Sequence, residues 1–352
     1  MFEPPRCPYK DCHKHKHPEP GFAWKIGSYK PKCRPHPVPR FECQTCLRTF
    51  SRQTFRADFR DHKPHLNPQL FQLLASGVGL RQSARVLGLS LRCTEIKFRK
   101  IAAHLRDLNL NLRGPLEGIA KMQFDEFESY EGCRNTKPVT IPMLIETSTR
   151  FIIWSECAPI RPRGKMTPER IARIEAQESI SGRRKDESHR AIRNTLQFGA
   201  AIAEGCDEVV FCTDEKKVYP RFAKAAFRGL ELRHHTTNSK LARGTWNPLF
   251  AINHSEAMMR DLTGRVRRDS WLTSKEGWCL DLGLQLYMAY RNYVRRRFNR
   301  DKGSPASLLG FVERRMEATE CLSWRQDWGL SSPHPLGDGG RLVSQRVLSA
   351  AA

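Results

Sequence analysis

Acidic residues and long apolar runs are both scarce in this chain. Its 352 residues include 60 lysines and arginines against 37 aspartates and glutamates, so the formal charge is +23. Hydrophobic residues make up 39%, and no window reaches the ~18 consecutive apolar residues that a membrane span needs. These shortages exclude a membrane protein and predict a polyanionic partner, for which nucleic acid is the usual candidate.

The sequence also shows no secretory signal, because acidic and proline residues follow Met1 where a basic and then an apolar stretch would stand. We therefore expect a cytoplasmic protein with no membrane partner. In a reducing compartment, the twelve cysteines are better explained by metal binding and buried thiols than by disulfides. No internal repeat is evident, and the length suits two or three domains.

Residues 1–65 are predicted to form a small module held together by a metal. Cys7 and Cys12 make a C-x4-C pair, and Cys43 and Cys46 make a C-x2-C pair further along. Two such turns can present four thiolates to one structural zinc ion, and so small a segment folds only with its metal. The wide spacing of the first pair leaves open that one sulfur is replaced by another nearby ligand: His13, His15, His17, Cys33 or His36.

Residues 66–113 have the apolar spacing of helices and predict a helix-turn-helix DNA-binding domain. The first helix should end near Ser76 and the second should span 80–87, with Gly88 in the turn and Ser90 as the N-cap of the third. Basic side chains on or beside the last two helices are the expected DNA contacts. These are Arg81, Arg85, Arg92, Lys97, Arg99 and Lys100.

From Met122 onward, short β-rich runs alternate with helical patterns, which predicts a mixed α/β domain over residues 118–303. A strongly charged stretch near 160–187 is expected to be a surface insert. From residue 304 to 352 the chain is interrupted by Gly, Ser and Pro, and we expect a partly disordered tail.

Three carboxylates stand at suggestive positions in this basic domain. Asp125 lies inside the first strand, Asp214 ends a later strand, and Glu276 begins a long amphipathic helix. A strand interior is costly for a carboxylate, and strand ends in open sheets are where ligands bind. Acids gathered there suit two Mg²⁺ or Mn²⁺ ions and phosphodiester chemistry. Spacing alone does not select the trio, because other acids compete for it: Glu126, Glu215, Glu256 and Asp281.

The order of these motifs resembles a bacterial insertion-sequence transposase of the DDE class. The resemblance covers most of residues 1–300 and rests on the C-x4-C pair, RFECQTCLRTFS, GVGLRQSARVLGLS, FDEF, FCTDEKKVY and RVRRDSWLTSKEGWCLDL. It implies a multidomain α/β protein with a zinc ribbon, a helix-turn-helix and an RNase H-like catalytic domain. It also implies that Asp125, Asp214 and Glu276 hold the two metal ions.

The resemblance further implies that a basic segment ahead of the third acid faces DNA, through Arg260, Arg265, Arg267 and Arg268. Many families of the class place a lysine or arginine two helical turns after the glutamate, whereas this chain has Gly283 there. Arg291 and the cluster at 295–297 are the alternative contacts.

The sequence therefore predicts a DNA transposase that binds the terminal repeats of its own mobile element and cuts and joins DNA strands. Since transposition pairs two ends, we expect a homo-oligomer on double-stranded DNA. The alternative is a domesticated or decayed transposase that acts as a non-catalytic DNA-binding regulator. A third interpretation, an RNA-processing nuclease, shares the acids, but the helix-turn-helix favours duplex DNA.

Overall fold

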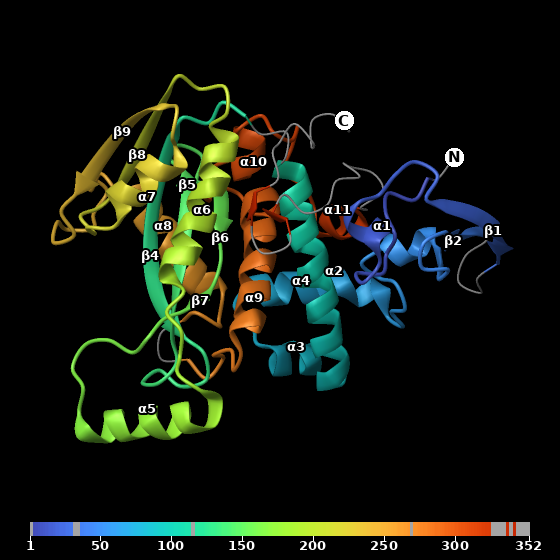
Figure 1. Cartoon of the computed structure of the whole chain (residues 1–352), viewed down its shortest axis with the longest axis horizontal. Coiled ribbons are helices and arrows are strands. Elements are labelled where there is room, and N and C mark those ends of the chain that lie inside the picture. Colours follow the sequence, from blue (N-terminus) through green and yellow to red (C-terminus); the bar gives the residue numbers. More distant parts are fainter. Residues whose placement is uncertain are drawn as a thin grey trace.

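The computed structural model shows three parts that follow one another along the chain (Figure 1). They are a small N-terminal sheet, a group of three helices, and a larger mixed sheet with its covering helices. The structure describes residues 3–30, 36–113, 117–267, 270–324, 336–337 and 341–342. Within these ranges, no helix has both the length and the apolar character to cross a membrane.

The N-terminal part is a three-stranded antiparallel sheet with a small core of its own. Four phenylalanines and the buried cysteines fill this core, which is separate from the main one. Its elements are α1 (His13–Lys16), β1 (Ala23–Tyr29), β2 (Val38–Cys43), β3 (Thr49–Ser51) and the 3-10 turns η1 (Arg52–Phe55) and η2 (Pro64–Leu66). So few apolar side chains cannot stabilise a sheet alone, which leaves a structural role for the cysteines.

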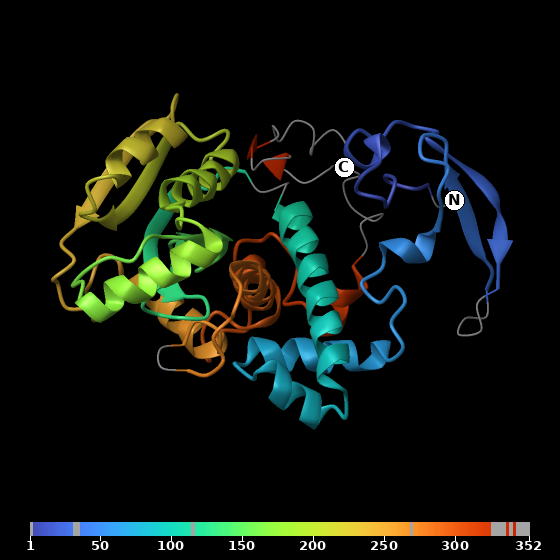
Figure 2. The ribbon, with the colours of Figure 1, turned by 60° about the horizontal axis from the view of Figure 1, so that its bottom comes forward.

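Three helices follow, at the places that the sequence predicts: α2 (Asn67–Ala75), α3 (Leu80–Val86) and α4 (Leu91–Arg113). Gly88 turns the chain between α3 and α4 at a φ of +60°. The Ser90 hydroxyl accepts a hydrogen bond from the Cys93 N–H, 3.2 Å away, and so caps α4. Buried residues of α2 and α4 belong to the main core, and α4 lies beside α9 (Gly277–Ala289) (Figures 1 and 2). The three helices are therefore packed onto the larger domain.

The larger part contains a six-stranded mixed sheet in the order β6-β5-β4-β8-β9, with β7 paired to β5. The central strand β4 runs antiparallel to β5 and parallel to β8, which is parallel to β9. The strands are β4 (Lys121–Tyr130), β5 (Pro138–Glu146), β6 (Ile152–Ser155), β7 (Ala158–Pro159), β8 (Glu208–Asp214) and β9 (Glu231–Thr237). This mixed α/β arrangement is consistent with an RNase H-like domain.

Helices cover both faces of the mixed sheet. The crossover helix α6 (Ser188–Ile202) packs so closely that a Cβ on Gly199 would lie 2.7 Å from Leu144 and 3.2 Å from Met122. On the same face, Tyr219 of α7 (Tyr219–Ala226) meets the ring of Phe124. The next helix, α8 (Phe250–Leu262), bonds to Gln123 and so covers the opposite face of β4.

The charged stretch near 160–187 contains α5 (Pro168–Ser181), which has no buried residue. Thr167 caps this helix by accepting a hydrogen bond from the Arg170 N–H. Figure 1 shows α5 extending away from the sheet beyond the end of β4.

The first part of the tail that is expected to be partly disordered, residues 304–324, is folded, and most of the remainder lies outside the described residues. After α9 come a π-helical turn, η3 (Tyr290–Val294), and then α10 (Pro305–Leu308) and α11 (Ala318–Ser323), whose inner residues join the main core. Ser304 caps α10 and Pro305 occupies its first turn, so the Ser and Pro that suggest disorder instead start a helix. Beyond residue 324 the described residues form only β10 (Leu336–Gly337) and β11 (Arg341–Leu342).

We predict that Trp324→Ala lowers the free energy of unfolding by about 3–5 kcal/mol, because a large buried ring is lost. Trp324 is 8% exposed, and its ring lies 5.6 Å from that of His104, whose Nε2 contacts the Cys321 carbonyl oxygen. The control is Trp246→Ala at a position that is 96% exposed, where we expect a change within about 0.5 kcal/mol. If urea unfolding showed the same loss of stability for Trp324→Ala and Trp246→Ala, the C-terminal segment would not be packed on the core.

Candidate carboxylate and thiolate metal sites

Strand β4 and helix α8 run side by side in the same direction with matched steps. At one end, the Ile252 N–H donates to Gln123 Oε1 over 3.0 Å. Eight helix residues after Ile252 and four strand residues after Gln123, the Arg260 guanidinium carbon lies 4.6 Å from the centre of the Phe127 ring. Two strand residues advance about 6.6 Å and four helix residues about 6 Å. The residues midway between these contacts, Asp125 and Glu256, therefore face each other.

Asp214 reaches the same place from β8. In the parallel pairing of β4 with β8, Gln123 lies opposite Cys212. Two residues further along both strands, Asp125 is level with Asp214, the last residue of β8. Three elements that are distant in sequence thus bring three carboxylates to one point of the sheet.

The electrostatics of the three acids show that they interact. Burial and then the nearby Asp214 carboxylate raise the pKa of Asp125 to about 6, against a hydrogen bond from the Glu126 N–H. Burial and then Asp125 raise the pKa of Glu256 to about 8, although Arg260 and Arg243 oppose the shift. Negative charge is therefore costly at this point of the protein unless a cation offsets it.

The residues fit a divalent cation. Glu256 is 2% exposed, and its Oε1 is buried without a hydrogen-bond partner among the described residues. A buried carboxylate oxygen with no donor is a costly arrangement that a hard metal ion would relieve. In the described part of the chain, the four cysteines are the only group of three or more candidate ligands whose atoms all lie within 4.8 Å of one another, so the three carboxylates are spaced more widely than that in the metal-free protein.

Glu276, the sequence-based choice for the third acid, lies elsewhere. It is the exposed N-cap residue of α9. The residues on either side of Glu276 contact the segment just after β4. The Gly132 N–H donates to the Ser274 carbonyl oxygen over 2.8 Å. A Cβ on Gly277 would lie 2.8 Å from Glu131 Oε2. Glu131 is six residues beyond Asp125, which is roughly 20 Å along a strand. This distance corrects the assignment of Glu276.

Glu256 is one of the acids that compete with Glu276 for the third position in the sequence analysis. The sequence contains a feature that favours it. It lies on the same helical face as Ile252 and Met259, which are both fully buried. An acid on the apolar face of an amphipathic helix is an exception that needs a partner.

The other competing acids are occupied or exposed. Glu126 points to the opposite face of β4, where it accepts hydrogen bonds from the hydroxyls of Thr140 and Tyr219 and pairs with Lys216. Asp281 accepts a bond from the Cys157 N–H and pairs with Arg106. Glu215 is exposed.

The four predicted cysteines do come together. The Cys7 and Cys46 sulfurs are 3.7 Å apart, as are those of Cys12 and Cys43, and all four sulfurs lie within 4.8 Å of one another. A tetrahedral zinc site with 2.3 Å bonds would place its sulfurs about 3.8 Å apart. The alternative ligand His15 instead uses its Nδ1 to contact the Cys7 carbonyl oxygen, and Cys33 lies outside the described residues.

Burial raises the pKa of the Cys7 thiol. At Cys46 burial acts in the same direction, but hydrogen bonds from the backbone and side chain of Arg48 outweigh it and lower the pKa to about 7. Cys46 can therefore supply a thiolate at neutral pH, which is the form that binds metals.

The predicted DNA contacts on the helices divide into exposed and buried groups. Lys97 is not available for a DNA contact, because its ammonium is buried against Asp61 and also donates to Asn67 Oδ1. Lys100 is half-buried and donates to the Phe59 carbonyl oxygen. The exposed members of the group are Arg81, Arg85, Arg92 and Arg99.

The predicted basic segment before Glu276 divides in the same way. Arg265 packs over the Phe98 ring and donates to the Ser274 hydroxyl over 2.6 Å, so it joins the three helices to the larger domain. Arg260 is half-buried beside Glu256, Arg267 is exposed, and Arg268 lies outside the described residues. The alternative contact Arg291 is fully buried and donates to the carbonyl oxygens of residues 296 and 297.

We expect one zinc ion per chain in the purified protein, bound by the four cysteines. Cys43→Ser should remove the zinc and unfold the N-terminal sheet, because that sheet has too small a core to stand alone. Native mass spectrometry measures the metal, and Cys206→Ser, which changes a half-buried thiol outside the cluster, is the control that should keep it. A Cys43→Ser protein that still carried one zinc would contradict the assignment.

The raised pKa of Glu256 predicts how stability depends on pH in the metal-free protein. Its ordinary value of 4.5 rises to about 8 on folding, so the folded protein holds an extra proton between these values. The free energy of unfolding should therefore fall as pH rises through this range. Glu256→Gln should remove this loss and be about 1–3 kcal/mol more stable than the wild type at pH 9.

Urea unfolding in EDTA at several pH values measures this dependence. Glu276→Gln, at an exposed position, is the matched control and should follow the wild type. Parallel pH curves for the wild type and Glu256→Gln would show that Glu256 is not a buried, proton-binding carboxylate.

Comparisons with known proteins do not assign the chain to a family. No protein-family model matches the chain, and no curated protein matches it. Among solved structures, the one titled "Crystal structure of the Mos1 mariner paired end complex with Mn" matches at a TM-score of 0.20 and 11% identity, over 60% of this chain and 72% of that chain. A likeness of this degree transfers neither a fold nor a function to this chain.

Proposed function

We propose that the protein is a DNA transposase that cleaves and joins DNA strands with two divalent metal ions. The observation that carries the proposal is the meeting of Asp125, Asp214 and Glu256 on the mixed sheet. Burial, and then the nearby carboxylates, raise the pKa of Asp125 and of Glu256, and one Glu256 oxygen has no hydrogen-bond partner among the described residues. Such a site suits Mg²⁺ or Mn²⁺.

In this proposal the carboxylates of Asp125 and Asp214 would bind the ions, and Glu256 would complete the site from α8. Two bound ions would supply a metal-activated nucleophile and would stabilise the charge on the attacking and leaving oxygens of a phosphodiester. Arg260, whose guanidinium is 3.6 Å from Glu256, orients that carboxylate. Glu126, bonded on the opposite face, fixes β4 against β5 and α7.

The parts before the mixed sheet support a DNA-binding role in the same proposal. We propose that the N-terminal sheet with its four cysteines is a zinc ribbon and that α2, α3 and α4 form a helix-turn-helix. The exposed arginines of α3 and α4, Arg81, Arg85 and Arg92, would contact DNA. The net charge of +23 favours the same partner. A homo-oligomer on paired element ends follows from the reaction.

The test is strand cleavage by the purified protein on a plasmid that carries the gene's own flanking DNA. With Mg²⁺ we expect nicking or joining at defined positions, and none with EDTA. Asp214→Asn and Glu256→Gln should each reduce the rate by at least about 100-fold, because each removes a ligand of the metal site. Glu276→Gln should stay within about threefold of the wild type, since the residue lies roughly 20 Å away.

Two outcomes would overturn parts of this proposal. Loss of cleavage in Glu276→Gln with normal cleavage in Glu256→Gln would return the third acid to the helix start. Sequence-specific DNA binding with no metal-dependent cleavage, in protein that retains its zinc, would replace the transposase with a non-catalytic DNA-binding regulator.

A further inference from the structure

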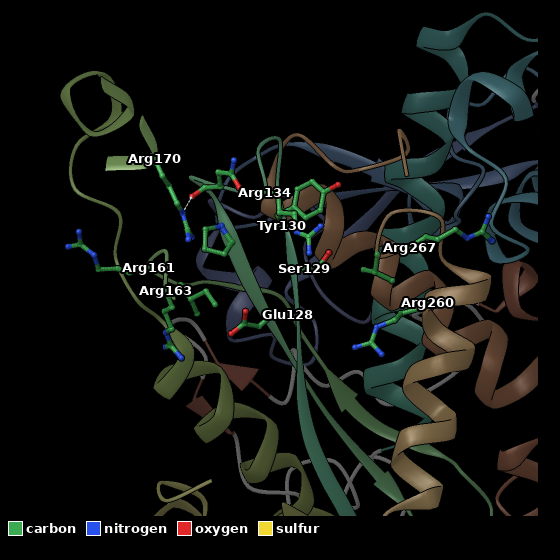
Figure 3. A pocket seen from close by; sticks show the side chains of 13 residues that line it. Glu128, Ser129, Tyr130, Arg134, Arg161, Arg163, Arg170, Arg260 and Arg267 are labelled. Atoms are coloured by element: carbon green, nitrogen blue, oxygen red, sulfur yellow. Dashed lines mark hydrogen bonds between the residues drawn. The ribbon is translucent and has the colours of Figure 1, made fainter. Parts of the chain in front are cut away.

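A cavity of about 480 Å³ opens beside the C-terminal half of β4, beyond the three carboxylates (Figure 3). Its lining is strongly basic, with a single acid, Glu128, among the described residues that form it. Six arginines contribute to the wall: Arg134, Arg161, Arg163, Arg170, Arg260 and Arg267. Four acids outside the lining each pair with one of these arginines: Glu178, Asp186, Glu256 and Asp261. The positive charges still outnumber the negative ones by six to five, and the guanidinium groups face the cavity, so it favours an anion.

The arginines come from two sides of the cavity. Figure 3 shows Arg161 and Arg163 on one side and Arg260 and Arg267 on the other, with Glu128 between them. The first pair belongs to the charged insert that holds α5, whereas Arg260 lies on α8 and Arg267 follows it. An extended anion lying in the cavity would therefore meet guanidinium groups on both sides.

The insert is fixed in place by hydrogen bonds at both of its ends. Arg170 donates from Nε to the Asn135 carbonyl oxygen over 3.2 Å. Arg184 donates from Nη1 to Glu131 over 2.8 Å and from Nη2 to the Pro138 carbonyl oxygen over 2.8 Å. These bonds tie the insert to the turn after β4 and to the first residue of β5, so its backbone is held beside the cavity.

Two arginines are especially open to solvent. The Arg163 side chain is 51% exposed and forms an exposed ion pair with Asp186. The Arg267 side chain is 47% exposed and donates to the Asp261 carbonyl oxygen. Exposed ion pairs contribute little to stability, so these guanidinium groups can turn to a phosphate, for which their planar fork is well suited.

The position of the cavity indicates which anion it receives. Glu128, Ser129 and Tyr130 line it and lie three to five residues beyond Asp125, which is about 10–17 Å along a strand. DNA advances about 3.4 Å per nucleotide, so this span corresponds to about three to five nucleotides. We infer that the arginine cavity binds the phosphate backbone of DNA about three to five nucleotides from the cleaved bond. The inference rests on the proposed function, and it assigns the insert a DNA-holding role.

The experiment compares two double variants that each remove two positive charges. Arg163→Gln with Arg267→Gln changes one arginine on each side of the cavity. Lys224→Gln with Arg228→Gln is the control, because both residues are exposed and neither lines the cavity; Lys224 lies in the last turn of α7 and Arg228 follows the helix. Fluorescence anisotropy with a labelled duplex from the gene's flanking DNA gives the affinity at a series of KCl concentrations.

We expect the cavity variant to bind roughly tenfold or more weakly and to lower the slope of log affinity against log salt by about 1.8, since each phosphate contact contributes about 0.9. The control pair should keep the wild-type slope, and both variants should unfold at the wild-type temperature. If the slope of log affinity against log salt fell equally in both double variants, or fell in neither, the inference would be overturned.

A second arm separates DNA from small anions, with inorganic tripolyphosphate as the probe in thermal unfolding. If the cavity variant lost stabilisation by tripolyphosphate while its DNA slope stayed normal, the cavity would be a small-anion site and the inference would be wrong. Cleavage of the same DNA by the wild type in Mg²⁺ is measured in parallel. A lower slope without any wild-type cleavage would preserve the DNA-binding cavity and reject the transposase.

Discussion

The meeting of three carboxylates at one point of the sheet, where Glu256 is buried and Asp125 and Asp214 are half-buried, is the constraint on which the proposed chemistry depends. Asp125 and Glu256 face each other because β4 and α8 advance in equal steps, and Asp214 reaches the same level through the parallel pairing of β8. Burial and then the repulsion between the acids raise the pKa of Asp125 and of Glu256, so proton uptake relieves the repulsion in the metal-free protein. Divalent cations would relieve it without protons, so the fold holds the acids in a state that favours metal binding.

The same main core that positions the acids also holds the helices proposed to read DNA. Buried residues of α2 and α4 share this core with α9, and Arg265 links Phe98 of α4 to Ser274. The Cys321 carbonyl oxygen contacts His104 of α4 from the C-terminal side. DNA bound by the exposed arginines of α3 and α4 would therefore be held in a fixed relation to the carboxylates, which is what cutting at a defined distance from a recognised sequence requires.

Local patterns in the sequence predict the strands, the three helices and the four cysteines, because each depends on periodicity, on caps such as Ser90, or on short spacing. The features that sequence reasoning misses depend on contacts between distant segments. Lys97 appears to be a surface charge until Asp61 is found beside it. Glu276 begins a helix as an acid should, but only the pairing of Gly132 with Ser274 reveals its distance from Asp125. The placement of Glu256 likewise requires the register of α8 on β4.

Anomalous diffraction from crystals soaked with Mn²⁺ tests the central claim most directly. The account predicts two manganese peaks about 3.5–4 Å apart, bound by Asp125, Asp214 and Glu256, with no peak at Glu276. A manganese ion bound by Glu276, or crystals in which the three carboxylates bind no metal at a pH above the pKa of about 8 for Glu256, would contradict it.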